Sequence, residues 1–459
     1  MTEVALENGN MDTHAEEARL NKISNEEFKI WKKAVPTFYQ HISTFKPCLQ
    51  KHVTNQSKLQ KTVTFTDKMF PDMTKGTLTT SVLLALGSDI YEIDVILPIG
   101  AHLTSEESSC DVKPQYEAFL KTFEQTKFEP KWKVENNDTV AKLYYLNTSG
   151  VKFIAVTTNG SILWFRDEIT TAITSCVAEP QESGTKVDVR SDISSDLSTI
   201  AVITTITKDD IASSTIKIVD NVVKVGDVKR TIYVKDNFHC GSFKFVNGKD
   251  SVVLCDNHCT FKLWDLNNAD DTPSFVFTDN TEGKLTVIGT SKIVSTLFAT
   301  GSDNGTIKLW DLRSLSHNKT FEVGKDTDAV KEIALLSHFD DDAVSDIIFS
   351  STSACKFVTV GRSGNVYHWD MEYLFSKEQN DEKDSKNSDE ESIASSALQA
   401  ECLSFYHTGG FRRLRTDGAK RNTVACDSVI DDLVCTVDAD DLLTVYIPFT
   451  ARVASDSTD

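Results

Sequence analysis

The chain has 459 residues, of which 40% are hydrophobic, and a formal net charge of −20. Its length exceeds the ~100 to 200 residues of an ordinary domain, so it holds either several domains or one large repeat architecture. The 68 acidic residues against 48 basic ones disfavour nucleic-acid binding, which needs Lys and Arg to neutralise phosphates. They favour basic partners instead, although solubility alone also explains an acidic surface. Since no apolar run approaches the ~18 residues of a membrane-spanning helix, we expect no membrane span.

The two ends of the chain are polar. The first residues, MTEVALENGNMDTHAEE, lack the apolar stretch of a secretion signal, and the ten cysteines lack the dense spacing of a secreted disulfide framework. We therefore expect an intracellular protein, with disordered tails at residues 1–23 and 451–459.

A helix docked on the rest of the protein is expected at residues 24–45. Ser24 and Glu27 form the capping-box pattern that begins a helix, and Pro36 should kink or divide it. Apolar residues recur every three or four positions, which predicts one buried stripe made of Phe28, Trp31, Val35, Phe38 and Ile42.

One strand pattern then repeats seven times. Weak copies lie at residues 88–94, 159–165, 214–220 and 441–447, and strong copies lie at 260–268, 306–314 and 365–373. Each strong copy contains a Trp-Asp pair, and Trp264 and Trp310 are about one WD-repeat period (~40 to 45 residues) apart. The longer interval from Trp310 to Trp369 indicates a loop insertion. The six residues of these pairs are expected to act as structural anchors: Trp264, Asp265, Trp310, Asp311, Trp369 and Asp370.

Tight-turn signals precede these strands. Asn304-Gly305 and Ser363-Gly364 favour the positive φ of a two-residue hairpin turn, and Asp256-Asn257-His258 lies in the corresponding place. Since a four-stranded blade cannot bury both faces alone, seven repeats should close around an axis. The sequence therefore predicts an all-β fold, a seven-bladed WD40 β-propeller over residues 46–450, with the N-terminal α-helix on its side.

The sequence offers little for catalysis. His239, Cys240, Cys255, His258 and Cys259 lack the regular paired spacing of a zinc site. There is also no GxxxxGK[ST], HExxH or GxSxG motif. We expect no catalytic residue, no metal and no cofactor, although groups from different blades can converge only in space.

An acidic insertion is expected at residues 376–401, within the last interval between repeats. Its polar composition with almost no aromatic residue predicts a disordered loop. Ser388 precedes Asp389, Glu390 and Glu391, a pattern that resembles the site of an acidic-directed kinase.

Several of these segments together resemble the retinoblastoma-binding histone chaperone family. The resemblance rests on residues 25–33 with Pro36 and Tyr39, on the place of the acidic insertion, and on residues 405–410. In that family the helix and the later loop form a groove that grips a histone H4 helix. The resemblance implies a partner-binding groove built from Phe28 and Trp31 on the helical side, Phe405 on the loop side, and an acidic rim of Asp389, Glu390 and Glu391.

Two departures bear on this implied groove. Residues 46–50 replace the family's Trp-Pro-Ser-Leu-Thr, and residues 411–415 add basic charge beside it. The alternative interpretation is that Phe28 and Trp31 only dock the helix onto the propeller.

Within the family, the chain looks like the yeast WD-repeat repressor subunits of class I histone deacetylase complexes. This resemblance implies a non-catalytic nuclear scaffold, also able to reside in the cytoplasm, that represses transcription, including that of meiotic genes. Its implied partners are histone deacetylase complex subunits and histone H3 and H4 tails. The alternative function is a general WD-repeat adaptor in another nuclear assembly, such as ribosome biogenesis or ubiquitin ligation.

Overall fold

The computed structural model describes the propeller and leaves gaps between its strands. The described residues are 39–50, 60–72, 74, 77–98, 127–148, 150–178, 184–209, 211–234, 238–256, 258–268, 271–279, 283–315, 320–322, 332–372, 374, 399, 401–408, 423–428, 433–439 and 441–448. The expected helix up to residue 38, the expected tails and most of the acidic insertion lie outside these ranges.

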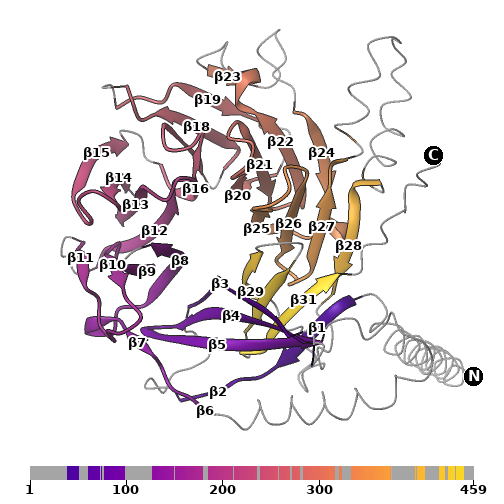
Figure 1. Cartoon of the computed structure of the whole chain (residues 1–459). Coiled ribbons are helices and arrows are strands. Elements are labelled where there is room, and N and C mark those ends of the chain that lie inside the picture. Colours follow the sequence, from indigo (N-terminus) through magenta and orange to yellow (C-terminus); the bar gives the residue numbers. More distant parts are fainter. Residues whose placement is uncertain are drawn as a thin grey trace, which may run out of the picture.

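Seven antiparallel sheets stand around a central axis as the blades of a propeller (Figure 1). The first three blades, each in order from the axis outward, are β3 (Lys61–Asp72), β4 (Thr77–Leu86), β5 (Asp89–Pro98) and β7 (Trp132–Lys133); β8 (Val140–Thr148), β9 (Val151–Thr157), β10 (Ile162–Phe165) and β11 (Thr174–Cys176); and β12 (Lys186–Ile193), β13 (Thr199–Lys208), β14 (Ile211–Asp220) and β15 (Val228–Val234).

The remaining blades continue the ring in chain order. They are β16 (Cys240–Val246), β17 (Ser251–Asp256), β18 (Thr260–Asp265) and β19 (Phe275–Thr278); β20 (Leu285–Thr290), β21 (Leu297–Ser302), β22 (Thr306–Asp311) and β24 (Ala334–Ser337); β25 (Val344–Phe349), β26 (Lys356–Gly361), β27 (Val366–Asp370) and β28 (Leu403–His407); and β29 (Thr423–Ser428), β30 (Val434–Asp438), β31 (Leu443–Pro448) and β1 (Tyr39–Phe45).

All seven copies of the repeated pattern form the third strand of a blade. These strands are β5, β10, β14, β18, β22, β27 and β31. The expected turns join second and third strands, with Gly305 at φ 82° and Gly364 at φ 87°, conformations that glycine adopts without strain. The seven-bladed β-propeller predicted from the sequence is therefore confirmed.

The start of the propeller differs from the prediction. Residues 39–45, expected at the end of the helix, form strand β1, which pairs antiparallel with β31. The helical spacing of apolar residues runs on to Ile42, but pairing with β31 satisfies the backbone of both strands and gives the seventh blade its fourth strand. Strand β1 thus closes the ring by pairing with β31, which lies about 400 residues further along the sequence.

Short elements extend this ring. Strand β23 (Thr320–Glu322) adds a parallel fifth strand to the fourth blade beside β19, and β2 (Cys48–Leu49) pairs in parallel with β6 (Lys127–Phe128). Within the described ranges the 3-10 helices are η3 (Glu135–Asn137), η4 (Leu312–Leu315) and η5 (Phe339–Asp341). Among the described residues, no helix has the length and apolar character needed to span a membrane.

The core lies between neighbouring blades, and the repeated tryptophans stand in it. Trp264, Trp310 and Trp369 are at most 2% exposed. Trp310 of the fifth blade contacts Phe261 and Phe277 of the fourth, with ring centroids 5.4 and 4.9 Å apart. Each blade thereby buries its apolar face against the next, which a single sheet in water cannot do.

The aspartates of the Trp-Asp pairs turn the chain at the end of the third strand. Asp265, Asp311 and Asp370 each accept a hydrogen bond of 2.9 to 3.0 Å from the backbone N–H two residues further on. This is an Asx turn, in which a short carboxylate side chain replaces a backbone carbonyl. The pairs therefore combine a core residue with a turn residue.

The sixth blade adds a polar relay behind its tryptophan. Trp369 Nε1 donates to Thr359 Oγ1 at 2.9 Å, and Thr359 Oγ1 lies 2.6 Å from His338 Nε2. His338 Nδ1 bonds the carbonyl oxygen of Asp342, which can only accept, so Nδ1 carries the proton. Burial lowers the pKa of His338 to about 4. The imidazole is therefore neutral at pH 7.

Candidate functional site

Phe405 lies on the flank of the propeller where the sixth and seventh blades meet. It belongs to β28, the outer strand of the sixth blade, opposite His368 of β27. The centroid of its ring lies 5.5 Å from the ring centroid of His368 and 6.4 Å from that of Tyr446 of β31. The side chain is partly buried, so part of it faces outward.

The same flank receives the N-terminal strand. Ile42 of β1 is the register partner of Tyr446, and Ile42 and Phe405 pack against one cluster of buried residues. His368 Nε2 and the Tyr446 hydroxyl are 2.9 Å apart, and His407 stacks on Tyr446 at 4.2 Å. Phe405 therefore shares one apolar cluster with Ile42 of β1, the strand formed by the last residues of the expected helix.

Of the residues predicted to bind a partner, the structure describes Phe405 alone. Phe28 and Trp31, the acidic Asp389, Glu390 and Glu391, and the expected phosphorylation site Ser388 lie outside the described residues. The end of the insertion at residues 376–401 is partly described. There the Gln399 amide oxygen accepts hydrogen bonds from the backbone N–H and hydroxyl of Ser337, at 3.2 and 2.9 Å. This end of the insertion is thus fixed to the fifth blade, because Ser337 belongs to β24.

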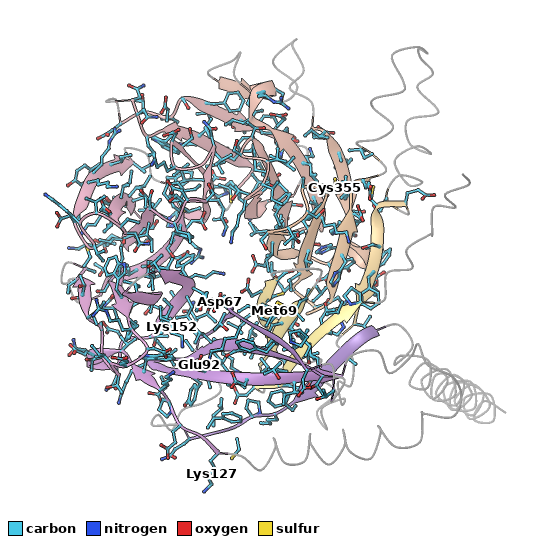
Figure 2. All side chains as sticks on the ribbon, in the orientation of Figure 1. Asp67, Met69, Glu92, Lys127, Lys152 and Cys355 are labelled. Atoms are coloured by element: carbon cyan, nitrogen blue, oxygen red, sulfur yellow. The ribbon has the colours of Figure 1, made fainter. Side chains whose placement is uncertain are left out.

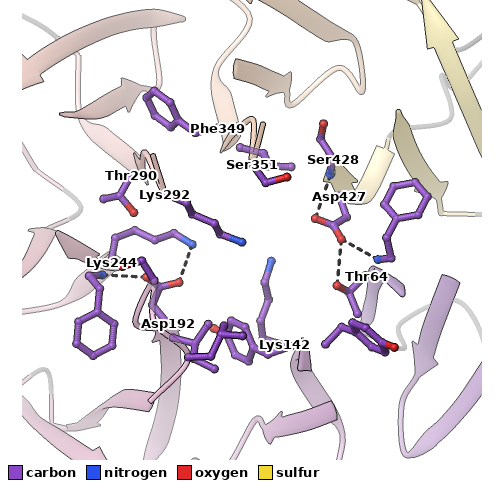
Figure 3. Close-up of a pocket in the computed structure, with 18 of the residues that line it drawn as sticks. Thr64, Lys142, Asp192, Lys244, Thr290, Lys292, Phe349, Ser351, Asp427 and Ser428 are labelled. Carbon is purple, nitrogen blue, oxygen red and sulfur yellow. Dashed lines mark hydrogen bonds and ion pairs between the residues drawn. The ribbon is translucent and has the colours of Figure 1, made fainter. Parts of the chain in front are cut away.

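A second candidate site, which sequence reasoning missed, is a cavity on the propeller axis. Its volume is about 350 Å³, within the range of small-molecule sites. The inner strands of several blades supply its charged lining, among them Lys142, Asp192, Lys244 and Asp427, while Lys292 follows β20 (Figure 3). Lys142, Asp192, Lys244 and Lys292 follow one another at intervals of 50, 52 and 48 residues, and this regular spacing is the sequence signal that could have revealed them.

The carboxylates of this cavity are held by its wall. Asp427 Oδ2 accepts hydrogen bonds from the backbone N–H of Phe65 at 2.8 Å and the Thr64 hydroxyl at 3.0 Å. Asp192 Oδ2 likewise accepts one from the backbone N–H of Phe245 at 2.8 Å, and its other oxygen lies 3.3 Å from Lys244 Nζ. Both aspartates therefore join their blade to the next one.

Burial and pairing shift the pKa values of these groups. Burial raises the pKa of Asp427, a rise that the Phe65 N–H and the charge of Lys142 oppose. Burial alone would lower the pKa of Lys244, but the nearby Asp192 and Asp346 outweigh it and raise that pKa. Lys244 is thus held in its charged form.

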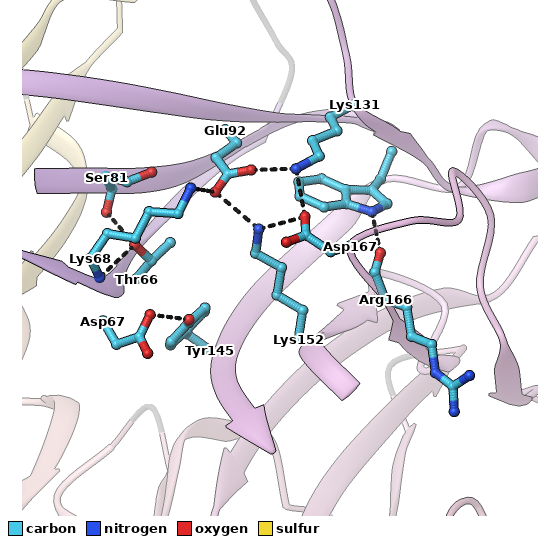
Figure 4. Close-up of polar contacts among 11 residues, drawn as sticks. Thr66, Asp67, Lys68, Ser81, Glu92, Lys131, Tyr145, Lys152, Arg166 and Asp167 are labelled. Carbon is cyan, nitrogen blue, oxygen red and sulfur yellow. Dashed lines mark hydrogen bonds and ion pairs between the residues drawn. The ribbon is translucent and has the colours of Figure 1, made fainter. Parts of the chain in front are cut away.

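A third cluster, also missed, joins the first two blades (Figures 2 and 4). Glu92 forms ion pairs with Lys68, Lys131 and Lys152 at 2.6 to 2.9 Å. Burial alone would raise the pKa of Glu92, but the three lysines outweigh it and lower the pKa to about 2. Asp167 bridges Lys131 and Lys152. The cluster is satisfied internally, which indicates a structural role.

Two of the cysteines considered for a metal site are enclosed in the core. Cys240 and Cys255 are buried, and burial raises the pKa of both thiols, to about 12 in the case of Cys255. Within the part of the chain that the structure describes, no group of three or more His, Cys, Asp or Glu side chains is arranged to hold a metal ion. High thiol pKa values disfavour thiolate ligands at pH 7.

The seven-bladed ring with Trp-Asp pairs at the ends of three of its third strands places the protein in the class of WD-type β-propellers. Comparison with known sequences narrows this class. The chain is 37% identical to the transcriptional regulatory protein UME1 of Saccharomyces cerevisiae, with 96% of this chain and 97% of that protein covered. It is also similar to the transcriptional modulators WTM2 (37% identity, 92% and 95% covered) and WTM1 (33% identity, 92% and 98% covered) of the same yeast.

No protein-family model matches the chain. The similarity to UME1, WTM2 and WTM1 extends over nearly the whole length of both sequences in each comparison. The chain therefore belongs to the family of yeast transcriptional regulators that contains these three proteins. The resemblance to yeast WD-repeat repressors expected from the sequence is confirmed. A role in transcription regulation follows from that membership.

Proposed function

We propose that the protein is a non-catalytic scaffold subunit of a nuclear histone deacetylase corepressor complex. In this role it represses transcription, including that of meiotic genes, through contacts with deacetylase-complex subunits and histone H3 and H4 tails. Its membership in a family of transcriptional regulators supports the regulatory part of the proposal. The propeller, which presents surfaces on every side of a rigid ring, supports the scaffold part.

One observation supports a partner site on the flank of the sixth and seventh blades. The partly buried Phe405 lies on the blade flank beside Ile42 and Tyr446, where the chain enters β1 from the segment that holds Phe28 and Trp31. We propose that the segment before β1 supplies the helical side of the site and that Phe405 of β28 supplies the other side. A groove between that helix and β28 can take an amphipathic helix, whose apolar face buries against aromatic side chains.

The charge of the protein fits the proposed histone contact. A net charge of −20 attracts lysine-rich tails over long range, and salt screens this attraction beyond ~8 Å. Electrostatic attraction therefore speeds encounter, while Phe28, Trp31 and Phe405 supply the contact area.

The proposal is tested by purifying the tagged full-length protein from nuclear extract, identifying the co-purifying proteins and assaying deacetylase activity. We expect a deacetylase together with corepressor subunits. Recovery of ribosome-assembly factors or a ubiquitin ligase, without deacetylase activity, would instead establish the rival function of a general WD-repeat adaptor.

A further inference from the structure

The lining of the axial cavity carries three lysines, Lys142, Lys244 and Lys292, and four aspartates, Asp67, Asp192, Asp346 and Asp427, and two of these lysines form no direct ion pair within the described part of the chain. Lys244 forms an ion pair with Asp192, and the negative charges of Asp192 and Asp346 both raise its pKa. Lys142 and Lys292 instead both act electrostatically on one carboxylate, Asp427. Among the described residues, neither Lys142 nor Lys292 forms a direct ion pair.

That single carboxylate is already engaged by the wall. Asp427 accepts hydrogen bonds from the N–H groups of Phe65 and Ser428 and from the Thr64 hydroxyl. The other cavity aspartates have wall partners too. Asp67 accepts a hydrogen bond from the Tyr145 hydroxyl, and Asp346 accepts one from the backbone N–H of Ile347.

The two lysines are aimed at the open centre. Figure 3 shows the side chains of Lys142 and Lys292 extended from opposite sides of the ring into the space between the blades. Lys142 comes from β8 of the second blade, and Lys292 follows β20 of the fifth. Two ammonium groups that converge in one cavity without a directly paired carboxylate can attract an anion between them.

We propose that the axial cavity binds a small anion that carries phosphate groups, with Lys142 and Lys292 as its principal ligands. Lysine binds phosphate as a compact point charge, and among the described residues no arginine lines the cavity to add bidentate recognition. The hydroxyl groups of Thr290 and Ser351 lie in the same lining and can donate to phosphate oxygens. The volume of about 350 Å³ suits a small organic phosphate.

This site is independent of the proposed corepressor function, because it lies on the axis and uses none of the flank residues. A small phosphorylated molecule bound there would stabilise the ring, because it would contact several blades at once. Six lining residues belong to six different blades: Thr64, Lys142, Asp192, Lys244, Asp346 and Asp427. A ligand that bridges blades raises the unfolding temperature as its concentration increases.

The test uses the full-length protein and isothermal titration calorimetry with pyrophosphate and with ADP, at constant ionic strength set by chloride. Wild type is expected to bind at least one of these probes, and Lys292→Met and Lys142→Met to weaken binding at least tenfold each. Lys224→Met is the matched control, since it removes the same charge from an exposed turn between β14 and β15 and should leave binding unchanged. Tighter binding of ADP than of pyrophosphate would identify a nucleotide as the source of the phosphate.

Two further variants keep the test decisive. Asp427→Asn removes the negative charge that faces both lysines, so it should tighten binding of pyrophosphate. Lys142→Arg retains the charge and should bind if Lys142→Met fails to fold. Absence of binding by either phosphate probe to the folded wild type overturns the proposal, as does binding of a hexaglutamate peptide with no binding of phosphate, which would assign the lysines to an acidic protein partner.

Discussion

The carboxylate of Asp427 in the seventh blade accepts a 2.8 Å hydrogen bond from the backbone N–H of Phe65 in the first. This bond joins the last inner strand, β29, to the first, β3, next to the point where β1 closes the ring on the outside. Asp192 makes the same bond to Phe245 between the third and fourth blades. Aspartates on inner strands thus connect adjacent blades at the axis.

Removing the Asp427 side chain should destabilise the protein. Asp427→Ala leaves the Phe65 N–H and the Thr64 hydroxyl without their acceptor, at a cost of about 2 kcal/mol, whereas Asp427→Asn keeps an acceptor oxygen and should cost about 1 kcal/mol. Urea unfolding measures both. Asp346→Ala is the control, because Asp346 lines the same cavity but bonds only the next N–H. Equal losses for Asp427→Ala and Asp346→Ala would refute the inter-blade role.

The tryptophans of the strong repeats should differ in what their hydrogen bonds contribute. Trp369 Nε1 donates to Thr359, whereas Trp264 Nε1 is buried without a hydrogen-bond partner among the described residues. Both are at most 2% exposed, so replacement by Phe removes a similar volume. We expect Trp369→Phe to cost about 1 kcal/mol more than Trp264→Phe in urea unfolding. The reverse order would show that the Thr359 relay contributes nothing to stability.

Acid should weaken the junction of the first two blades. Glu92 has a folded pKa of about 2, below its ordinary value of 4.5, so its ion pairs stabilise the fold above that value and are lost as pH falls towards 2. Because Lys131 is 41% exposed and screened by water, we expect a contribution of about 2 kcal/mol at pH 7 rather than the full value of the shift. The free energy of unfolding, measured in urea, should fall less steeply from pH 7 to pH 2 in Glu92→Gln than in wild type. Parallel curves for the two proteins would contradict this assignment.

Two phenylalanines near the ring closure should respond differently to truncation. Phe45 of β1 is 2% exposed, and Phe45→Ala should cost about 3 to 5 kcal/mol. Phe405 is only partly buried, so Phe405→Ala should cost about 1 to 2 kcal/mol. Thermal or urea unfolding distinguishes them. If Phe405→Ala is as damaging as Phe45→Ala, Phe405 is a core residue and cannot serve as a partner contact.

The sequence was most informative where a residue pattern is local. Trp-Asp pairs and Gly305-type turns recur within one hairpin, so three third strands could be placed from them and the other four from their match to the same strand pattern. Strand β1 was missed because its pairing with β31 spans the whole chain, while the apolar spacing that ends at Ile42 is helical. Pairing partners this distant leave no local signal.

The sites show the same limit. The resemblance in residues 405–410 singled out Phe405, but its neighbours His368 and Tyr446 come from other strands and could not be foreseen. Lys142, Lys292 and Asp427 approach one another only because the ring closes. Each of them, read alone, is an ordinary charged residue in a strand or a turn.

The most direct test of the proposed corepressor role is whether a variant that lacks the flank aromatic side chains still captures deacetylase activity. Tagged wild type and the double variant Phe28→Ala with Phe405→Ala are purified from nuclear extract, after matching unfolding curves have shown that both fold. Lys224→Met serves as a surface control. We predict that wild type and Lys224→Met capture deacetylase activity and that the double variant loses most of it; equal capture by all three, or none by wild type, would contradict the proposal.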